Sequence, residues 1–109
     1  MAEVQAPRPL SGLNDGDRVF DLRVIATPGH TRGHISVLDE TAGVLVVGDA
    51  LRTDGGLLAG SNPQFTEDGA AAAATVAKLG ALTFETLLPG HGEPILSAAS
   101  AAVRTLAGG

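Results

Sequence analysis

The sequence contains no cysteine, tryptophan or tyrosine, and its aromatic side chains are limited to three phenylalanines. The lack of cysteine excludes disulfide bonds, thiolate metal ligands and cysteine nucleophiles, and it leaves the redox compartment undetermined. Because aromatic side chains are so few, the core of this 109-residue chain must be built from valine, isoleucine, leucine and alanine. A chain of this length forms one domain with a modest core.

Positive charge and long apolar runs are scarce as well. The formal net charge is −5, and lysine and arginine together number 7. No cluster of basic side chains is present to displace counterions from phosphates, so we expect no nucleic-acid partner. The first residues hold no apolar signal segment, and no run is long enough to cross a bilayer. We therefore expect no membrane partner and a cytoplasmic protein.

Three apolar runs each lead to a turn that carries a possible metal ligand. The runs cover residues 22–26, 44–47 and 86–88, and the polar side chains that follow them are His30, Asp49 and His91. Glycine flanks each of these polar residues, as expected where a buried strand stops at a turn. Two imidazoles and a carboxylate are the ligands expected at a catalytic zinc or iron centre.

The N-terminal part of the chain is interpreted as a lead-in to the domain. Residues 1–14 contain prolines and show no periodicity, so we place the domain over residues 15–109. Asp15-Gly16-Asp17 has the composition of the start of a calcium loop, but the later acidic ligands of such a loop are missing. A hairpin turn is the favoured interpretation of these three residues.

Strands and helices alternate along the rest of the chain. Strands are expected over residues 18–26, 35–38, 44–47 and 86–88, and the run at 44–47 is typical of a strand buried on both faces. Residues 51–63 contain glycines without a phosphate-binding pattern, and we interpret them as a mobile loop beside a site. Helices are expected over 66–79, capped by Thr66, and from a Ser97 cap to about Leu106.

The order of these elements predicts that the three possible ligands converge. The strand at 35–38 returns antiparallel to the one before it, and a tight turn reverses the chain again into 44–47. A helix at 66–79 then acts as a crossover, which joins parallel strands. The strands that precede His30, Asp49 and His91 therefore run in one direction and end at one edge of the sheet. Sites in open α/β sheets gather at that edge.

Each possible ligand also has a purely structural alternative. A single histidine in a loop is commonly a solvated or hydrogen-bonded side chain. The Gly48-Asp49 pair after a strand is often a helix cap, and Pro-Gly-His-Gly at residues 89–92 can be a turn in which the histidine is incidental. The placement of all three at strand ends on one edge favours the metal interpretation.

Three sequence strings resemble motifs of a known family. They are T-P-G-H-T-R-G-H at residues 27–34, G-D-A-L at 48–51 and L-P-G-H-G at 88–92. In this order they resemble the C-terminal half of the metallo-β-lactamase superfamily, which includes glyoxalase II-like thioesterases, lactonases and nucleases. The resemblance covers about residues 15–96. It implies an α/β fold that is half of an αββα sandwich, a mixed sheet with helices on one face.

The resemblance also implies roles for individual residues. His30 matches the histidine that completes the first metal site, Asp49 the carboxylate that bridges two metals, and His91 the histidine of the second site. Thr31 and His34 match positions that steady the loop behind the ligands. The implied metal is zinc, or alternatively iron or manganese, and Asp49 takes part in catalysis by a metal-activated water. The implied substrate is a small molecule with an ester, thioester or related bond, bound by residues that the sequence does not identify.

Two arginines and one glutamate lie near the implied site in the sequence. Arg32 and Arg52 are placed to meet an anionic substrate, although solvated surface charge is the simpler interpretation of both. Glu93 precedes a proline in a turn and is expected to be exposed.

The chain departs from the family in one respect. The H-x-H-x-D-H string of the N-terminal half is absent, and all three histidines are already assigned. A dinuclear site needs about twice the ligands that remain, so the isolated chain is expected to be inactive. It has the character of a truncated domain, and only a second half makes the site dinuclear.

The strands at 22–26, 44–47 and 86–88 are too apolar to face water on either side. We therefore expect the missing N-terminal half, or a second copy in a homodimer, to cover the sheet. The rival hypothesis is a non-catalytic half-domain that dimerises or binds a partner through this apolar sheet face.

Overall fold

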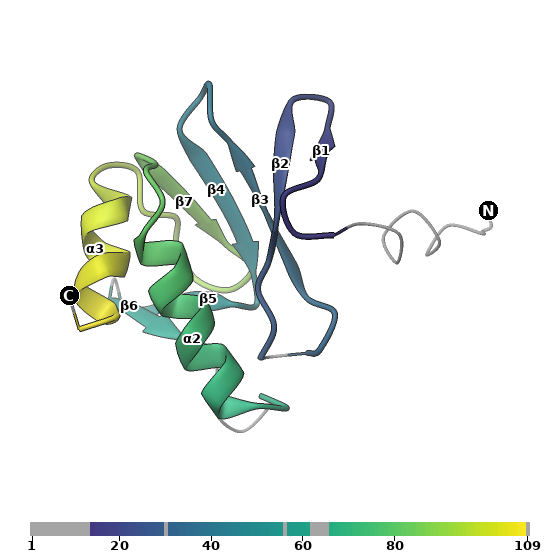
Figure 1. The fold of residues 1–109 in the computed structure, drawn as a ribbon. Coiled ribbons are helices and arrows are strands. Elements are labelled where there is room, and N and C mark those ends of the chain that lie inside the picture. The colour runs from purple at the N-terminus through teal and green to yellow at the C-terminus, as the bar shows by residue number, and fades with distance from the viewer. Residues whose placement is uncertain (1–13, 30, 56, 62–65, 109) are drawn as a thin grey trace.

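Five strands form one mixed sheet (Figure 1). A computed structural model describes residues 14–29, 31–55, 57–61 and 66–108. The order across the sheet is β1-β2-β3-β4-β7, with bounds Arg18–Val19, Leu22–Ala26, Ile35–Asp39, Val44–Gly48 and Thr86–Pro89. The first three neighbouring pairs are antiparallel, whereas β4 and β7 are parallel. β2, β4 and β7 therefore run in the same direction, which confirms the predicted α/β class and the predicted strand directions.

Two helices cover one face of the sheet (Figure 1). α2 spans Gly69–Gly80 in the crossover between β4 and β7, and α3 spans Ala99–Leu106 after β7. The core lies between sheet and helices and is built from aliphatic side chains with one aromatic: Ile25, Leu38, Leu45, Val47, Ala50, Leu51, Val76, Leu79, Phe84, Leu87, Ala99 and Val103. Neither of these helices has the length and hydropathy needed to span a membrane, which holds for the described residues.

The other face of the sheet is apolar too, and part of it is open. The register places Val24, Val37, Val46 and Leu88 side by side across β2, β3, β4 and β7. Val46 is 43% exposed and Leu88 37% exposed. The prediction that residues 44–47 are buried on both faces is therefore wrong within this chain. The strand alternates, because only the side chains of Leu45 and Val47 point into the core.

The predicted single strand at 18–26 is a tight hairpin of β1 and β2. Phe20 and Asp21 form its two-residue turn with φ of 52° and 68°. Two successive residues in the left-handed region are the geometry of a turn that matches the twist of the strands. The turn could not be predicted from the sequence, because phenylalanine stands where glycine or asparagine is usual.

The predicted loop at 51–63 is also wrong over its described part. β5 (Leu51–Asp54) pairs antiparallel with β6 (Leu57–Gly60) in a separate hairpin. Leu51 and Thr53 are buried and alternate with exposed or half-buried neighbours, so the segment behaves as a strand with one inner face. Residues 62–63 lie outside the described residues.

Both predicted helix caps are corrected. α2 is capped by Asp68, whose carboxylate accepts a hydrogen bond from the Ala71 amide at 3.0 Å, and not by Thr66. α3 begins after Ala98, which has a φ of 55° and makes no side-chain cap. Hydrogen bonds to a neighbouring segment take the place of the predicted Ser97 cap. The first amides of α3 donate to backbone carbonyls in the segment before β7, namely those of Phe84 and Glu85.

The predicted lead-in covers residues 1–14, and only Asn14 of it is among the described residues. Residues 1–13 are not among the described residues, and Asn14 leads into the turn at Asp15 and Gly16. The Asn14 amide donates to the Asp17 carboxylate at 2.8 Å, which is the local bonding of a turn. The boundary between lead-in and domain stays a prediction.

Candidate functional site

The turns after β4 and β7 are locked together at one edge of the sheet. The Gly90 amide donates to the Gly48 carbonyl at 2.8 Å, and a Cβ on Gly90 would lie 3.1 Å from the Gly48 carbonyl carbon. Asp49 and His91 each follow one of these glycines directly, and both are exposed. The His91 carbonyl accepts a hydrogen bond from the Thr53 amide at 3.2 Å, which fixes the second turn to β5. Two of the three predicted ligands therefore come from adjoining turns.

A second set of hydrogen bonds ties the turn at Asp49 to the end of β2. His34 Nε2 accepts from the Asp49 amide at 3.2 Å, and His34 Nδ1 lies 2.8 Å from the Thr27 hydroxyl. Because Nε2 accepts, Nδ1 carries the proton and donates to Thr27. Thr27 in turn lies 2.9 Å from the Ser36 hydroxyl, and both of these hydroxyl side chains are buried. Bonds of this kind hold a loop in place; that His34 steadies the loop behind a metal centre stays a prediction.

The predicted ligand His30 lies outside the described residues, whereas both of its neighbours are described. Gly29 is buried with a φ of 136°, and its amide donates to the Thr31 carbonyl at 3.1 Å. This bond joins the two described neighbours of position 30. Thr31 is exposed, and its backbone carbonyl is the group that makes this contact.

The described residues carry part of a metal-binding set. Within the described ranges, no three histidine, cysteine, aspartate or glutamate side chains lie close enough together to hold a metal ion. Asp49 and His91 nevertheless offer a carboxylate and an imidazole from exposed turns at one edge. These donors suit zinc, iron or manganese. The donor types fit such a metal, and the set needs more ligands than these two.

Two small clefts are lined by residues that neighbour the predicted ligands in the sequence. One of about 190 Å³ is lined by residues that flank position 30 and by the start of α2: Pro28, Gly29, Arg32, Glu67, Asp68 and Ala71. Another of about 260 Å³ is lined by Thr53, Gly55, Gly92 and Glu93, directly after His91. Glu93 is exposed, as predicted, while its carbonyl accepts from the Thr53 hydroxyl at 2.8 Å.

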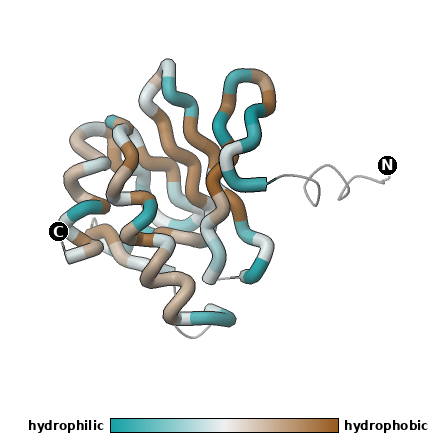
Figure 2. Tube along the Cα trace, viewed as in Figure 1, coloured by the Kyte–Doolittle hydropathy of each residue, from teal (hydrophilic) through white to brown (hydrophobic). Residues whose placement is uncertain are grey.

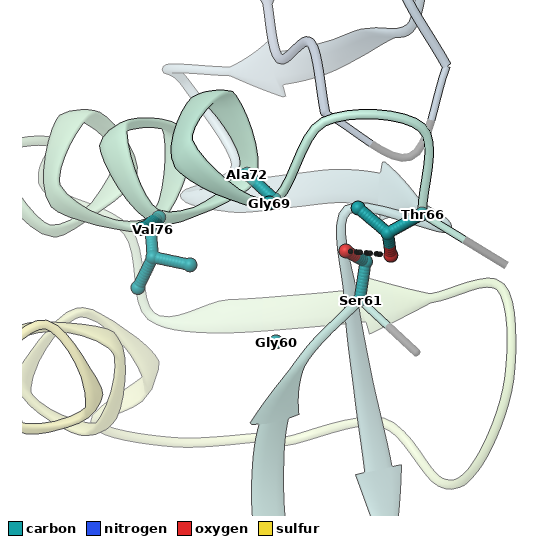
Figure 3. A pocket seen from close by; sticks show the side chains of 7 residues that line it. Gly60, Ser61, Thr66, Gly69, Ala72 and Val76 are labelled. Carbon is teal, nitrogen blue, oxygen red and sulfur yellow. Dashed lines mark hydrogen bonds between the residues drawn. The ribbon is translucent and has the colours of Figure 1, made fainter. Parts of the chain in front are cut away.

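Another cleft lies elsewhere, between α2 and β6 (Figure 3). It measures about 310 Å³ and is lined mainly by small residues and by Val76. The hydroxyls of Ser61 and Thr66 lie 2.8 Å apart at its edge. None of the predicted site residues lines this cleft, so its volume alone does not connect it with the ligand-bearing edge.

The two arginines near the site differ in their bonding. The backbone amide of Arg32 donates to the Glu67 carboxylate at 3.1 Å, and its side chain is exposed. Arg52 Nε donates to the Gly60 carbonyl at 3.1 Å, and its guanidinium lies 3.8 Å from the Asp54 carboxylate. The Arg52 side chain is therefore bonded within the β5–β6 hairpin, which favours the structural interpretation for this residue.

Residues 5–91 match the model of the metallo-β-lactamase superfamily. The chain belongs to that superfamily. Among curated relatives of this superfamily member, the probable metallo-hydrolase YflN of Bacillus subtilis (strain 168) is 43% identical, over 65% of this chain and 31% of that protein. The uncharacterized protein YobT of the same organism is 42% identical over 46% of this chain and 22% of its own length.

Solved structures of superfamily members share the fold. The metallo-β-lactamase family protein TTHA1429 from Thermus thermophilus matches with a TM-score of 0.70 and 28% identity, over 88% of this chain and 33% of that one. TTHA1623 in a di-iron-bound form matches with a TM-score of 0.65 and 30% identity, over 75% of this chain and 40% of that one. The chain thus spans at most about two-fifths of the length of these relatives. The match confirms the predicted relation to part of the metallo-β-lactamase fold.

Proposed function

We propose that this chain carries the C-terminal ligands of a metal-dependent hydrolase, namely His30, Asp49 and His91. The observation that carries the proposal is the lock between the turns after β4 and β7, which brings Asp49 and His91 to the same edge. The family supports it, because one relative is named a probable metallo-hydrolase and another has a solved structure in a di-iron-bound form. The glyoxalase II-like subgroup is the assignment that the sequence strings favour.

The residues at this edge suit the task of holding metal and orienting the reaction. A bound zinc, iron or manganese ion supplies Lewis acidity and lowers the pKa of a water molecule. Asp49 has two carboxylate oxygens, so it is able to bind two cations at once. His91 offers its imidazole from a turn that Gly90 and Thr53 hold on both sides. The substrate class is a small molecule with an ester, thioester or related bond.

The remaining ligands of a dinuclear site must come from residues other than His30, Asp49 and His91. The sequence has three histidines and no H-x-H-x-D-H string. The N-terminal half of a complete fold, or a second copy of this chain, would supply them and would lie on the open sheet face. The half-exposed Val46 and Leu88 support a second layer there. The same observation favours the second candidate, a non-catalytic half-domain that binds a partner through this face.

Metal content per chain tests the proposal. Protein purified without added metal is analysed by plasma mass spectrometry, as wild type and as His30→Ala and His91→Ala. We expect near-stoichiometric metal in the wild type and its loss in both variants. Glu93→Gln is the control, since it removes an exposed carboxylate next to His91 that is not a proposed ligand. Wild-type protein without metal would contradict metal binding by this chain and leave the binding-domain candidate.

A further inference from the structure

The loop that leads to position 30 is held along one face of α2. Three backbone carbonyls before position 30 accept hydrogen bonds from this helix or from its cap residue. Lys78 Nζ donates to the Ala26 carbonyl at 2.9 Å, and Thr75 Oγ1 donates to the Pro28 carbonyl at 2.7 Å. The Asp68 amide donates to the Gly29 carbonyl at 2.9 Å. The helix therefore binds the loop at successive points along its backbone.

The loop approaches this helix too closely to allow a side chain between them. A Cβ on Gly29 would lie 2.4 Å from the Ala72 Cα atom, which is far inside van der Waals contact. Ala72 and Thr75 lie three residues apart, so they share one face of α2, and Asp68 caps the N-terminus of the helix. Alanine at position 72 has a small side chain, so the loop backbone is able to lie directly on this face.

Thr75 is the buried polar residue of this contact. Its side chain is only 3% exposed, and it stands within an otherwise alanine-rich helix. A buried hydroxyl needs a hydrogen-bond partner. The partly buried Pro28 carbonyl, 47 residues away in the sequence, is that partner.

We propose that Thr75 is a positioning residue for the ligand-bearing loop. Its hydroxyl fixes the Pro28 carbonyl and so holds the Pro28-Gly29 segment that directly precedes position 30. Thr75 acts through this backbone and not by contact with metal or substrate. The consequence for metal binding rests on the proposed function, whereas the consequence for the loop does not.

Amide hydrogen exchange in the metal-free protein tests the effect on the loop. Thr75→Val keeps the size and the branching at Cβ but removes the hydroxyl, whereas Thr75→Ser keeps the hydroxyl. We expect Thr75→Val to speed exchange of the Thr27 and Gly29 amides about tenfold, as for the loss of one buried hydrogen bond. Thr75→Ser should restore the slow exchange. Unchanged exchange in Thr75→Val would overturn the proposal.

A matched variant separates a local effect from general destabilisation. The Ser100 hydroxyl also bonds to backbone groups, those of Leu82 and Phe84, but far from the loop in sequence and on a different helix. Ser100→Ala should therefore leave the relative protection of the Thr27 and Gly29 amides unchanged. Faster loop exchange in Ser100→Ala that equals that of Thr75→Val would also overturn the proposal.

Metal affinity, measured by calorimetric titration with zinc, distinguishes this inference from the proposed function. We expect Thr75→Val to weaken zinc binding about tenfold and Thr75→Ser to retain it. If zinc binding in the wild type does not depend on His30, the proposed function fails and the exchange result alone decides the role of Thr75. If zinc binding depends on His30 but equals the wild type in Thr75→Val, the positioning role is overturned.

Discussion

The imidazole of His34 accepts a hydrogen bond from the backbone amide of Asp49 at 3.2 Å, so a side chain from one turn holds the backbone of another. The same ring reaches the Thr27 hydroxyl at 2.8 Å on its other side. A Cβ on Gly48 would lie 3.0 Å from His34 Nε2, which shows how closely the ring packs on the end of β4. His34 thus joins the carboxyl ends of β2 and β4.

Replacement of His34 should destabilise the metal-free protein. His34→Ala leaves the buried Thr27 hydroxyl and the Asp49 amide without this partner, so we expect a loss of about 1–3 kcal/mol in the free energy of unfolding. His91→Ala should cost less than about 0.5 kcal/mol, because the His91 side chain is exposed and its backbone bonds are retained. Urea unfolding of both variants measures the difference. Equal losses would contradict the structural role of His34.

Gly29 should not tolerate a side chain. In Gly29→Ala the new Cβ would overlap the backbone of Ala72, and the φ of 136° at this position adds strain. We expect a loss of more than about 2 kcal/mol in the free energy of unfolding. Gly33→Ala is the matched control in the same loop, since no atom lies within 4 Å of its added Cβ. Thermal unfolding of the pair measures the effect, and similar melting temperatures would refute the close packing.

Hydrophobic pattern explains why the sheet was predictable from sequence. The runs that became β2, β4 and β7 are mainly apolar and lead into turns that contain glycine, and the helix in the crossover between β4 and β7 is the connection expected of parallel strands. The positions of Asp49 and His91 at one edge follow from these local signals. No contact between side chains had to be known.

Other features could not be read from sequence because they depend on distant partners. The β5–β6 hairpin has a glycine-rich composition, and it is defined by the burial of Leu51 and Thr53 against the rest of the fold. α3 starts without a side-chain cap because its first amides bond to carbonyls before β7. Thr75 gave no signal within an alanine-rich helix, since its partner Pro28 lies 47 residues away.

Asp15 should make stability depend on pH. Its carboxylate accepts from the Ala26 amide at 2.9 Å and lies 3.0 Å from Lys78 Nζ, and these two contacts lower its pKa, the Ala26 bond most strongly. A lowered folded-state pKa gives stability that is present above the unfolded pKa of about 4 and is lost as the pH falls through the folded value. Solvent exposure limits the contribution to about 1 kcal/mol.

Denaturant titrations between pH 7 and pH 2 check the effect of Asp15. Asp15→Asn should be less stable than the wild type at pH 7, and the two curves should converge below about pH 4. Lys78→Met should remove only part of the effect, because the Ala26 bond remains. A constant difference between Asp15→Asn and the wild type at every pH would contradict the assignment.

The open sheet face should make the isolated chain associate with itself. Val46 and Leu88 lie next to each other across the parallel β4–β7 pair, in a region that Figure 2 colours hydrophobic along both strands. Burial of such a row removes apolar surface from water at no cost in hydrogen bonds. We expect sedimentation velocity to show association that rises with concentration. The double variant Val46→Lys with Leu88→Lys should be monomeric, because a docked face would bury its charges.

Phe20→Ser is the control for this face. Phe20 is 92% exposed, but it lies in the turn between β1 and β2 and not in the apolar row. Its replacement should therefore leave self-association unchanged, although it removes more exposed apolar surface than either lysine substitution does. If Phe20→Ser abolishes association while the lysine variant retains it, the contact lies at the turn and the sheet face does not bind a second copy. If the wild type is monomeric at every concentration, the prediction of self-association is wrong and a different chain is the partner for this face.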